Sequence, residues 1–318
     1  MDQVYLKKKG KSNYRIIADL FFILFFLCAN FYCYKLEQSS TQANNINDLN
    51  SKQIIPWGVE ASNAPLYWSQ GYTGENIKIA VMDTGVDPSH PDLKGNIQEG
   101  FNAINPNEPP LDDNGHGTLV TGIISALQNN FGITGIAPDA EIYPVKVLDK
   151  YGEGDVTKVI QGIDWCIEHD IKLINMSFAI KDDDVILRKY IQRAIDAGII
   201  IVSSGSNTAG GIVGYPATYN GVISVTSVDK NNRIGTSSPR GKVDFSAPGV
   251  DIISTKPNGG YSIVSGTSFA APHITGVIAL MLDKNQDMTI NEVIANLKLF
   301  SKHLGDPNIY GEGMVILN

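Results

Sequence analysis

The chain is organised around a short stretch near its C-terminus, Ser265-Gly266-Thr267-Ser268-Phe269-Ala270-Ala271-Pro272-His273, which leads directly into the apolar residues 274–282. A small turn followed by an apolar run predicts a helix that starts near Ser268. At a helix start, free backbone N–H groups and the positive end of the helix dipole favour a developing negative charge. Ser268 is therefore a candidate nucleophile, provided that the chain supplies a base and an orienting acid. Serine is also a common helix cap, and both roles fit this stretch taken alone.

Charge is distributed unevenly along the 318 residues. Residues 1–34 contain five Lys or Arg and two Asp, a net charge of +3, which leaves −11 on the rest of a chain whose total is −8. An acidic body of this kind argues against nucleic acid as a partner. The length suffices for a sizeable core, and the three cysteines predict no disulfide framework. We expect a monomer.

The N-terminus predicts export. A basic segment, residues 1–15, precedes the apolar segment 16–36, and this order places the N-terminus in the cytoplasm. The apolar segment is either a retained signal anchor or a cleaved signal peptide; bulky aromatic residues near its end, in place of a small-residue cleavage site, favour the anchor. We expect membrane attachment through this segment and an extracytoplasmic body, which is secreted if the segment is cleaved. Polar residues 37–52 predict a linker, and residues 53–318 the folded domain.

Strand-like and helix-like segments alternate along the folded domain. Strands are predicted at residues 77–82, 141–148, 173–176, 199–202 and 222–228, and helices at 116–127, 155–168, 184–197, 274–282 and 290–299. The run Ile199-Ile200-Ile201-Val202 is apolar throughout, as is typical of a parallel strand buried on both faces. This order predicts an α/β fold, a three-layer, doubly wound, mostly parallel sheet with helices on both faces.

Two further stretches carry candidate catalytic groups. Asp83 directly follows the first buried strand, and sheets of this kind place their sites beyond the C-terminal ends of strands. His116 lies between Gly115 and Gly117, which allow backbone to pack closely around the imidazole, so it is the best candidate general base among five histidines. Each residue also has a structural interpretation, because Asp after a strand often caps a turn and His at a helix start often only packs.

In chain order, three stretches together resemble the subtilase family of serine proteases: Asp83-Thr84-Gly85, His116-Gly117-Thr118 and Gly266-Thr267-Ser268. The likeness runs from about residue 53 to near the C-terminus and includes His90-Pro91-Asp92-Leu93 and Asn175-Met176-Ser177. It implies the subtilase fold and a polypeptide substrate. It also implies that Ser268 attacks a peptide carbonyl, that His116 takes and returns the proton, and that Asp83 holds the imidazole.

The resemblance further implies a cleft that binds an extended substrate. The positions that match its edges are Gly152, Gly154, Ser177, Phe178 and Ala179. Gly214 matches the floor of the primary specificity pocket. Because glycine leaves room there, we expect cleavage after large apolar or aromatic residues.

Several positions depart from the family pattern. Ser206 stands where the family has an asparagine that donates to the oxyanion, and Asn207 follows one residue later, so either side chain, or neither, fills that role. Leu119 replaces a usual histidine and Ala179 a usual glycine. We also expect no inhibitory pro-domain, because only about twenty residues separate the apolar segment from the domain. These departures keep a second hypothesis open, a catalytically impaired subtilase that acts as a binding or regulatory protein.

The resemblance also implies a structural Ca²⁺ site. Its matching ligands are all oxygens, as a hard cation prefers: the side chains of Gln53, Asp92 and Asn129 and the backbone carbonyls of Leu127, Phe131 and Ile133. A metal-dependent hydrolase built on His90, His116 and Asp83 is disfavoured, because the sequence lacks a metalloprotease spacing. The sequence therefore predicts a serine endopeptidase that uses Asp83, His116 and Ser268.

Overall fold

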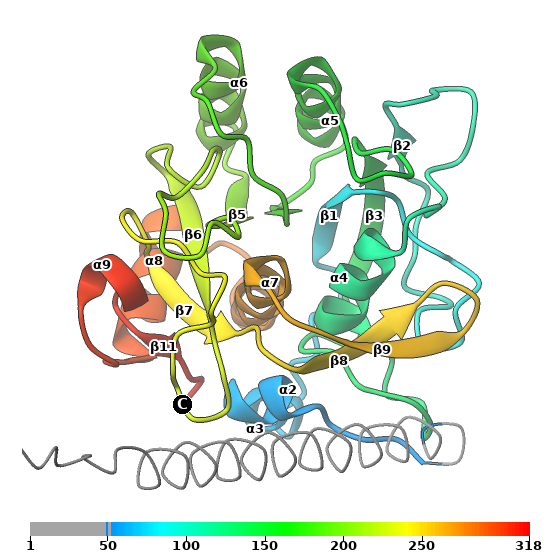
Figure 1. The fold of residues 1–318 in the computed structure, drawn as a ribbon. Helices are drawn as coiled ribbons and strands as arrows, with labels where there is room; N and C mark the ends of the chain where they lie inside the picture. Colours follow the sequence, from blue (N-terminus) through cyan, green and yellow to red (C-terminus); the bar gives the residue numbers. More distant parts are fainter. Residues whose placement is uncertain (1–48, 50–51) are drawn as a thin grey trace, which may run out of the picture. The chain divides into compact units, whose positions relative to one another are not determined.

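A nine-stranded sheet forms the centre of the part of the chain that the computed structural model describes, residue 49 and residues 52–318 (Figure 1). The strand order is β10-β11-β7-β6-β5-β4-β1-β3-β2, and neighbouring strands are parallel except for β10 and β11. The strands are β1 (Lys78–Asp83), β2 (Phe101–Asn102), β3 (Glu141–Lys146), β4 (Leu173–Met176), β5 (Ile200–Ser204), β6 (Val222–Val228), β7 (Phe245–Pro248), β10 (Ser301–Lys302) and β11 (Met314–Val315).

Helices cover both faces of this sheet (Figure 1). Along β1, Ile79 and Val81 join one apolar cluster while Ala80 and Met82 join another, because successive side chains of a strand point to opposite faces. The first cluster is shared with α2 (Trp57–Ala61), α3 (Ala64–Trp68), α4 (His116–Ser125), α7 (Thr267–Lys284) and α8 (Ile290–Leu299), and the second with α5 (Val156–Glu168) and α6 (Val185–Asp196). The predicted three-layer α/β fold is confirmed.

Helix α7 is buried on all sides. Every residue from Thr267 to Leu282 is buried, and the helix contacts β4, β5, β6, β7 and α4. A helix that is apolar all round belongs in the interior of a protein. The first turn of α7, which contains Ser268, is therefore held in place by the core. A hairpin of β8 (Ile252–Lys256) and β9 (Gly260–Val264) packs on α4, and a short helix, α9 (Pro307–Tyr310), lies near the C-terminus.

The helix starts follow from side-chain caps. Asp155 accepts a hydrogen bond from Lys158 N at the start of α5, and Asp184 accepts from Ile186 N and Leu187 N at the start of α6. Helix α4 ends at Ser125, two residues before the predicted end, because Leu127 N donates to Asp92 O (2.8 Å) outside the helix.

The apolar segment 16–36 and most of the predicted linker lie outside the described residues, so their roles stay predictions. Residues 49–318 form one compact unit, in which Leu49 is buried and its carbonyl accepts from Gly132 N (2.7 Å). Among the helices of residues 52–318, none is long and apolar enough to cross a membrane.

Candidate active site

The three candidate catalytic residues lie at the ends of three elements. Asp83 is the last residue of β1, His116 the first residue of α4, and Ser268 the second residue of α7. Helices α4 and α7 pack against each other on the same face of the sheet. The ring of Phe269, which follows Ser268, lies 5.4 Å from the imidazole of His116. The structure therefore brings the three stretches together at the C-terminal edge of β1, where parallel sheets place their sites.

Asp83 and His116 form a direct pair. His116 Nδ1 lies 2.8 Å from Asp83 Oδ1 and 2.9 Å from Oδ2, and the aspartate is fully buried. Burial lowers the pKa of His116, but the charge and hydrogen bond of Asp83, together with the charge of Asp112, raise that pKa above its ordinary value. A carboxylate at Nδ1 keeps the proton there, which leaves Nε2 as the basic nitrogen. This arrangement suits a general base.

Gly117 lets the first turn of α4 approach the backbone that follows β1. A Cβ atom at this position would lie 2.1 Å from Gly85 O and 3.2 Å from Asp83 Cβ, and a real side chain does not tolerate the first distance. Gly85 itself has a φ of 104°, in the region that favours glycine. Both glycines are therefore needed to bring the imidazole of His116 onto Asp83.

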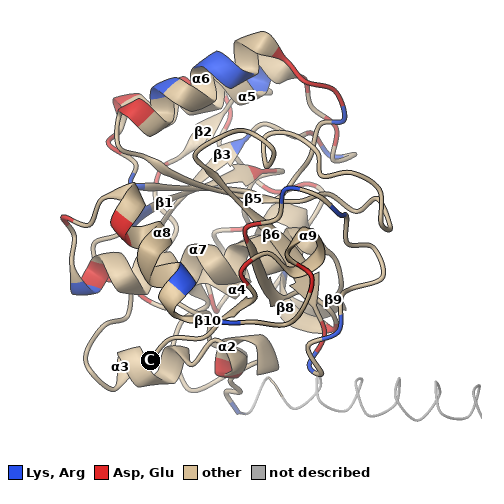
Figure 2. Ribbon diagram, turned by 90° about the vertical axis from the view of Figure 1, so that its left-hand side faces the viewer, with Lys and Arg blue, Asp and Glu red and all other residues tan. Residues whose placement is uncertain are grey.

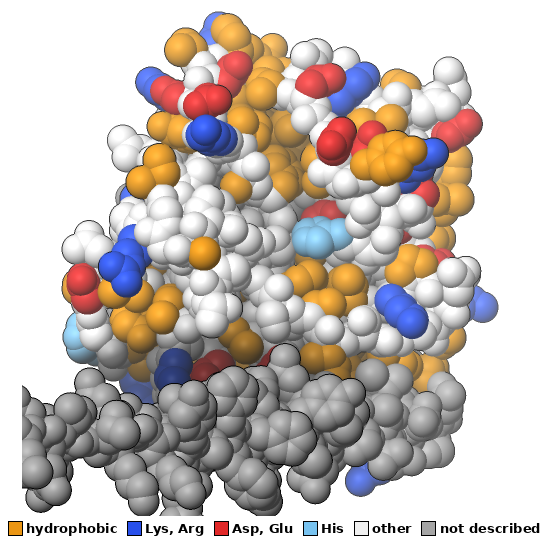
Figure 3. Space-filling model, in the orientation of Figure 1, with side chains coloured by type: hydrophobic (Ala, Val, Ile, Leu, Met, Phe, Trp, Pro, Cys, Tyr) orange, Lys and Arg blue, Asp and Glu red, His pale blue; other side chains and the backbone are white. Residues whose placement is uncertain are grey.

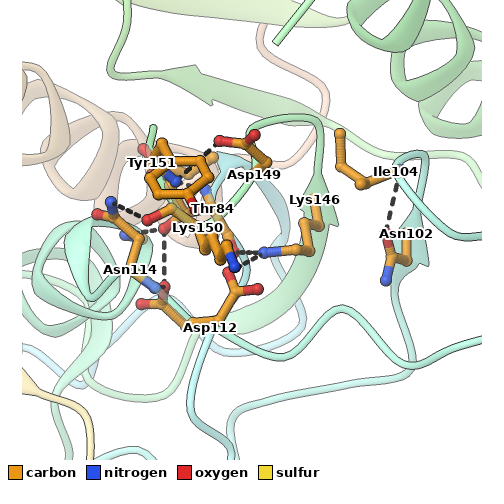
Figure 4. A network of polar contacts seen from close by, with 12 residues as sticks. Thr84, Asn102, Ile104, Asp112, Asn114, Lys146, Asp149, Lys150 and Tyr151 are labelled. Atoms are coloured by element: carbon orange, nitrogen blue, oxygen red, sulfur yellow. Dashed lines mark hydrogen bonds and ion pairs between the residues drawn. The ribbon is translucent and has the colours of Figure 1, made fainter. Parts of the chain in front are cut away.

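Asp112 supports the start of α4 (Figure 4). The N-cap of this helix is Gly115, which has no side chain to accept its free N–H groups. Asp112 accepts them instead, through Oδ1 from Gly115 N (2.7 Å) and through Oδ2 from Thr118 N (2.9 Å). Its Oδ1 also accepts from Thr84 Oγ1 (2.8 Å), which ties this support to the residue after Asp83. Asp112 lies four residues before His116 in the chain, and the sequence alone did not assign it this role.

Lys146 is a second supporting residue that the sequence did not reveal (Figure 4). It is the last residue of β3, in register with Asp83 of β1, and it is 5% exposed. Its ammonium donates to Thr84 O (2.5 Å) and to Asp113 Oδ1 (2.6 Å). The buried ammonium thus places a positive charge among the carboxylates around His116 and fixes the turn after Asp83.

Ser268 lies where the first turn of α7 leaves backbone N–H groups free. The preceding turn is held by Gly266 N, which donates to Gly249 O (2.8 Å), and Gly266 has a φ of 153°. Ser177 Oγ donates to Ser268 O (2.8 Å), which links the nucleophile's backbone to the segment that follows β4. Ser268 is 8% exposed, so it is largely buried and only a small part of it is accessible to solvent.

The structure separates the two oxyanion candidates, Ser206 and Asn207. Asn207 Oδ1 accepts from Thr267 N (3.0 Å) and from Ser237 Oγ (3.2 Å), so its amide lies beside the first residue of α7. Ser206 Oγ instead donates to Ile212 O (3.3 Å). The amide of Asn207 therefore lies beside Gly266 and Thr267, where α7 begins, whereas the hydroxyl of Ser206 is directed away from this helix. The sequence left the choice between Ser206 and Asn207 open; in the structure the backbone turns at Ser206 with a φ of 101°, and the next residue faces α7.

The predicted cleft residues lie around these groups. Ser177, Phe178 and Ala179 directly follow β4, and Phe178 packs partly into the apolar cluster shared with α5 and α6. Gly152 and Gly154 lie in the loop after β3, and Asn114 Nδ2 donates to Lys150 O (3.1 Å) at the start of that loop. Gly214 lies beside the segment that follows β4, because its neighbour Tyr215 pairs with Ile180, and its own N–H donates to Gly205 O (3.0 Å).

The predicted Ca²⁺ ligands meet in one place. Gln53 Nε2 donates to Leu127 O (2.6 Å), Ile133 O (3.2 Å) and Asn129 Oδ1 (3.3 Å). Asn129 Nδ2 donates to Asp92 Oδ1 (3.1 Å), and Phe131 N donates to Asn129 Oδ1 (3.2 Å). Carbonyl and amide oxygens thus converge on the end of the Gln53 side chain, with one carboxylate beside them. Residues 52–318 hold no group of three or more His, Cys, Asp or Glu that could bind a metal ion, so a site here would combine the single carboxylate of Asp92 with neutral oxygens.

Comparison with known proteins agrees with this geometry. Residues 74–313 match the model of the subtilase family. The chain is 40% identical over 270 residues to subtilisin E of Bacillus subtilis (83% of this chain, 70% of that protein) and to subtilisin of Bacillus pumilus (83% of this chain, 97% of that protein). It is also 40% identical over 264 residues to a thermostable alkaline protease of Halalkalibacterium halodurans, covering 83% of this chain and 72% of that protein. The chain belongs to the subtilase family of subtilisin-like serine proteases.

Proposed function

We propose that the protein is a serine endopeptidase in which Ser268 is the nucleophile, His116 the general base and Asp83 the group that orients His116. The observation that carries this proposal is the Asp83–His116 pair, in which Nδ1 of the imidazole lies 2.8 Å from a fully buried carboxylate. The same site contains Ser268, in the first turn of α7. His116 Nε2 takes the proton of Ser268 as the hydroxyl attacks the peptide carbonyl. The imidazole then returns that proton to the leaving amine.

The oxyanion that forms in this reaction has two donors in the proposal. The N–H of Ser268 is free because it belongs to the first turn of α7, and the Nδ2 group of Asn207 lies beside the same turn. Donors that are fixed before the reaction stabilise the charge without reorganising. The impaired-subtilase hypothesis rested on Ser206, on Leu119 and on the expected lack of a pro-domain, and the position of Asn207 weakens the first of these grounds.

The substrate in this proposal is an extracytoplasmic polypeptide. The basic segment and apolar segment at the N-terminus support export, through a retained anchor or a cleaved peptide. In the space-filling view the centre of the face is formed mainly by uncharged groups, with Lys, Arg, Asp and Glu around it (Figure 3). An uncharged binding surface favours an apolar residue before the cut over a basic one. Positions of acidic and basic residues are interspersed along the ribbon in Figure 2.

We also propose that Ca²⁺ binds to Gln53, Asp92 and Asn129 and to the carbonyls of Leu127, Phe131 and Ile133. The support is the donor chemistry, because the oxygens that approach the Gln53 amide are of the kind that a hard cation takes. Asp92 Oδ2 is further held by Ile133 N (2.9 Å) and Tyr261 Oη (2.8 Å), which fixes the only carboxylate of the set. The ion would tie residue 53 to the loop after α4 and has no part in the reaction.

Hydrolysis of a protein substrate tests the proposed activity. The full chain and its Ser268→Ala variant are purified in the same way, and release of peptides from fluorescently labelled casein is followed. We expect hydrolysis by the wild type and a loss of about 10⁶-fold in the variant, the scale found when a catalytic serine of this kind is removed. Equal rates for the two proteins, both shown to be folded by circular dichroism, would remove the enzyme interpretation.

A further inference from the structure

Two segments that are anchored beside the nucleophile flank Gly214. Ser177 Oγ bonds to Ser268 O (2.8 Å) and begins the first segment, which runs to Ala179. Thr267 Oγ1 bonds to Ser206 O (3.0 Å) on the second segment, so both are anchored to the first turn of α7. Gly214 joins them, because its N–H donates to Gly205 O and its neighbour Tyr215 exchanges backbone hydrogen bonds with Ile180 (2.7 and 2.8 Å). We call Ala179, Ser206 and Gly214 the specificity site.

The methyl group of Ala179 lies directly over Gly214. A Cβ atom built on Gly214 would lie 3.0 Å from Ala179 Cβ. Because a carbon–carbon bond is about 1.5 Å long, Gly214 Cα and Ala179 Cβ are at most about 4.5 Å apart. Carbon atoms in contact are about 3.5–4.0 Å apart, so no further group fits between the two. Ala179 is exposed while Gly214 is buried, so the methyl group forms the accessible surface above the floor glycine.

The Cβ atom of Ser206 narrows the space above Gly214 from the second segment, across from Ala179. This atom would lie 3.7 Å from the Cβ built on Gly214, at ordinary contact distance. The hydroxyl of Ser206 is directed to Ile212 O and lies outside this contact. Two side-chain carbons from facing segments therefore approach the position above Gly214. A glycine at position 179 or 206 would leave that position open.

We propose that the specificity site admits only a small residue, Gly, Ala or Ser, immediately before the cut, and that Ala179 sets this limit. The inference rests on the proposed function and replaces the expectation of large apolar or aromatic residues, which considered Gly214 without its neighbours. An aromatic ring would have to displace the Ala179 methyl group, which belongs to a segment held by the Tyr215–Ile180 pairing and by Ser268. The ring is therefore excluded by steric crowding against the Ala179 methyl group and the backbone that carries it, and not by polarity.

Paired substrates test the proposal. The full-length wild type, Ala179→Gly and Ala197→Gly are compared on succinyl-Ala-Ala-Pro-Ala and succinyl-Ala-Ala-Pro-Phe p-nitroanilides, with active enzyme counted by fluorophosphonate labelling of Ser268. Ala197 is exposed at the end of α6, outside the specificity site, so its variant controls for a change of alanine to glycine. We expect the kcat/KM of the wild type to be at least about tenfold higher for the Ala substrate than for the Phe substrate. In Ala179→Gly we expect the ratio of these two kcat/KM values to shift towards Phe by about 10–100-fold, which is the range that one misfitted carbon gives. Ala197→Gly keeps the wild-type ratio.

Covalent modification of Ser268 tests the same preference if the enzyme hydrolyses the two substrates too slowly to measure. Alanine and phenylalanine diphenyl phosphonates of the same peptide are allowed to modify Ser268, and the rates are measured by mass spectrometry. A wild type that reacts faster with the Phe probe, or an Ala179→Gly variant with an unchanged ratio, overturns the inference while leaving the proposed function in place. A folded wild type that neither reacts with the fluorophosphonate nor cleaves either substrate overturns the proposed function and the inference with it.

Discussion

Asp112 accepts a hydrogen bond from the backbone N–H of Thr118 at 2.9 Å, two residues beyond His116. The carboxylate lies four residues before the helix that begins with His116, and it takes the place of the missing N-cap side chain. Through Thr84 it is also connected to the turn that follows Asp83. The distance between the candidate base and its orienting acid is therefore set by a third residue, which touches neither imidazole nor substrate. Asp112 acts as a positioning residue.

Asp112→Asn is expected to shift the pH profile of activity. Catalysis needs neutral His116, and the negative charge of Asp112 contributes to raising the pKa of His116. Removing that charge lowers the pKa, so the acid limb of kcat/KM moves to lower pH. The looser support of α4 should also reduce kcat by up to about 100-fold. Asp113→Asn is the matched control, because Asp113 is half-exposed and bonds to Lys146 rather than to the helix. Identical acid limbs in wild type and Asp112→Asn would contradict this role.

His273 is expected to make the fold sensitive to acid. It is 1% exposed, Nδ1 faces Phe269 O, and Nε2 has no hydrogen-bond partner among the described residues. Burial lowers the pKa of His273 from 6.5 to about 4. The unfolded chain therefore takes up the proton first, and the free energy of unfolding falls as pH drops from about 6.5 to about 4, by about 3 kcal/mol in all.

Urea unfolding of the full chain between pH 7 and pH 4 measures this effect. The control is His273→Leu, which fills similar space without a titrating group. We expect a shallower dependence of the unfolding midpoint on pH in the variant, whatever its stability at pH 7. The same pH slope in both proteins would show that His273 is not the acid-sensitive group.

Ser206→Gly is expected to stabilise the protein. Ser206 has a φ of 101°, which glycine adopts without cost and which is unfavourable for a residue with a Cβ atom. Relief of this strain should raise the free energy of unfolding by about 1 kcal/mol, or Tm by about 2–4 °C. Thr208→Gly in the same loop has no such strain to relieve and should lower Tm. Calorimetry of both variants decides the point, and a lower Tm for Ser206→Gly would contradict it.

Removal of Ca²⁺ is expected to lower Tm. An ion that binds the folded state alone stabilises it by about 2.7 kcal/mol at a concentration a hundred times Kd. Thermal unfolding is measured with added Ca²⁺ and with a chelator, for the wild type and for Asn129→Ala, which lacks one ligand. The expected result is a chelator effect in the wild type that is smaller in the variant. A wild-type Tm that is the same in both buffers would exclude the site.

The sequence predicted those features that depend on local pattern. Alternating apolar runs predicted the order of strands and helices, and the predicted helices 155–168 and 184–197 begin at Asp155 and Asp184, which cap them in the structure. The motifs of Asp83, His116 and Ser268 are each contiguous, so the resemblance to the subtilase family could be read from the sequence, and it implied that the three residues meet. The residues that hold these motifs in position could not be predicted in this way. Lys146 bonds to Thr84 O, 62 residues earlier in the chain, and Asp112 accepts from Thr118 N, 6 residues later.

The specificity site shows most clearly what could not be predicted from the sequence. Gly214 was interpreted by itself as an open floor, whereas its environment is set by Ala179, a residue 35 positions earlier in the chain whose methyl group lies above it. Likewise, Ser206 and Asn207 could not be told apart until the positive φ of Ser206 was known. Both points concern the direction in which a side chain points, and this depends on backbone angles and neighbouring segments rather than on residue type.

The most direct test of the central claim is the reaction of the folded full-length chain with a fluorophosphonate, read by peptide mass spectrometry. The account predicts a single modification on Ser268, absent in Ser268→Ala and at least about 1,000-fold slower in His116→Ala, because the nucleophile then has no base. A wild type that is folded but unmodified at Ser268, or that reacts equally well without His116, would contradict it.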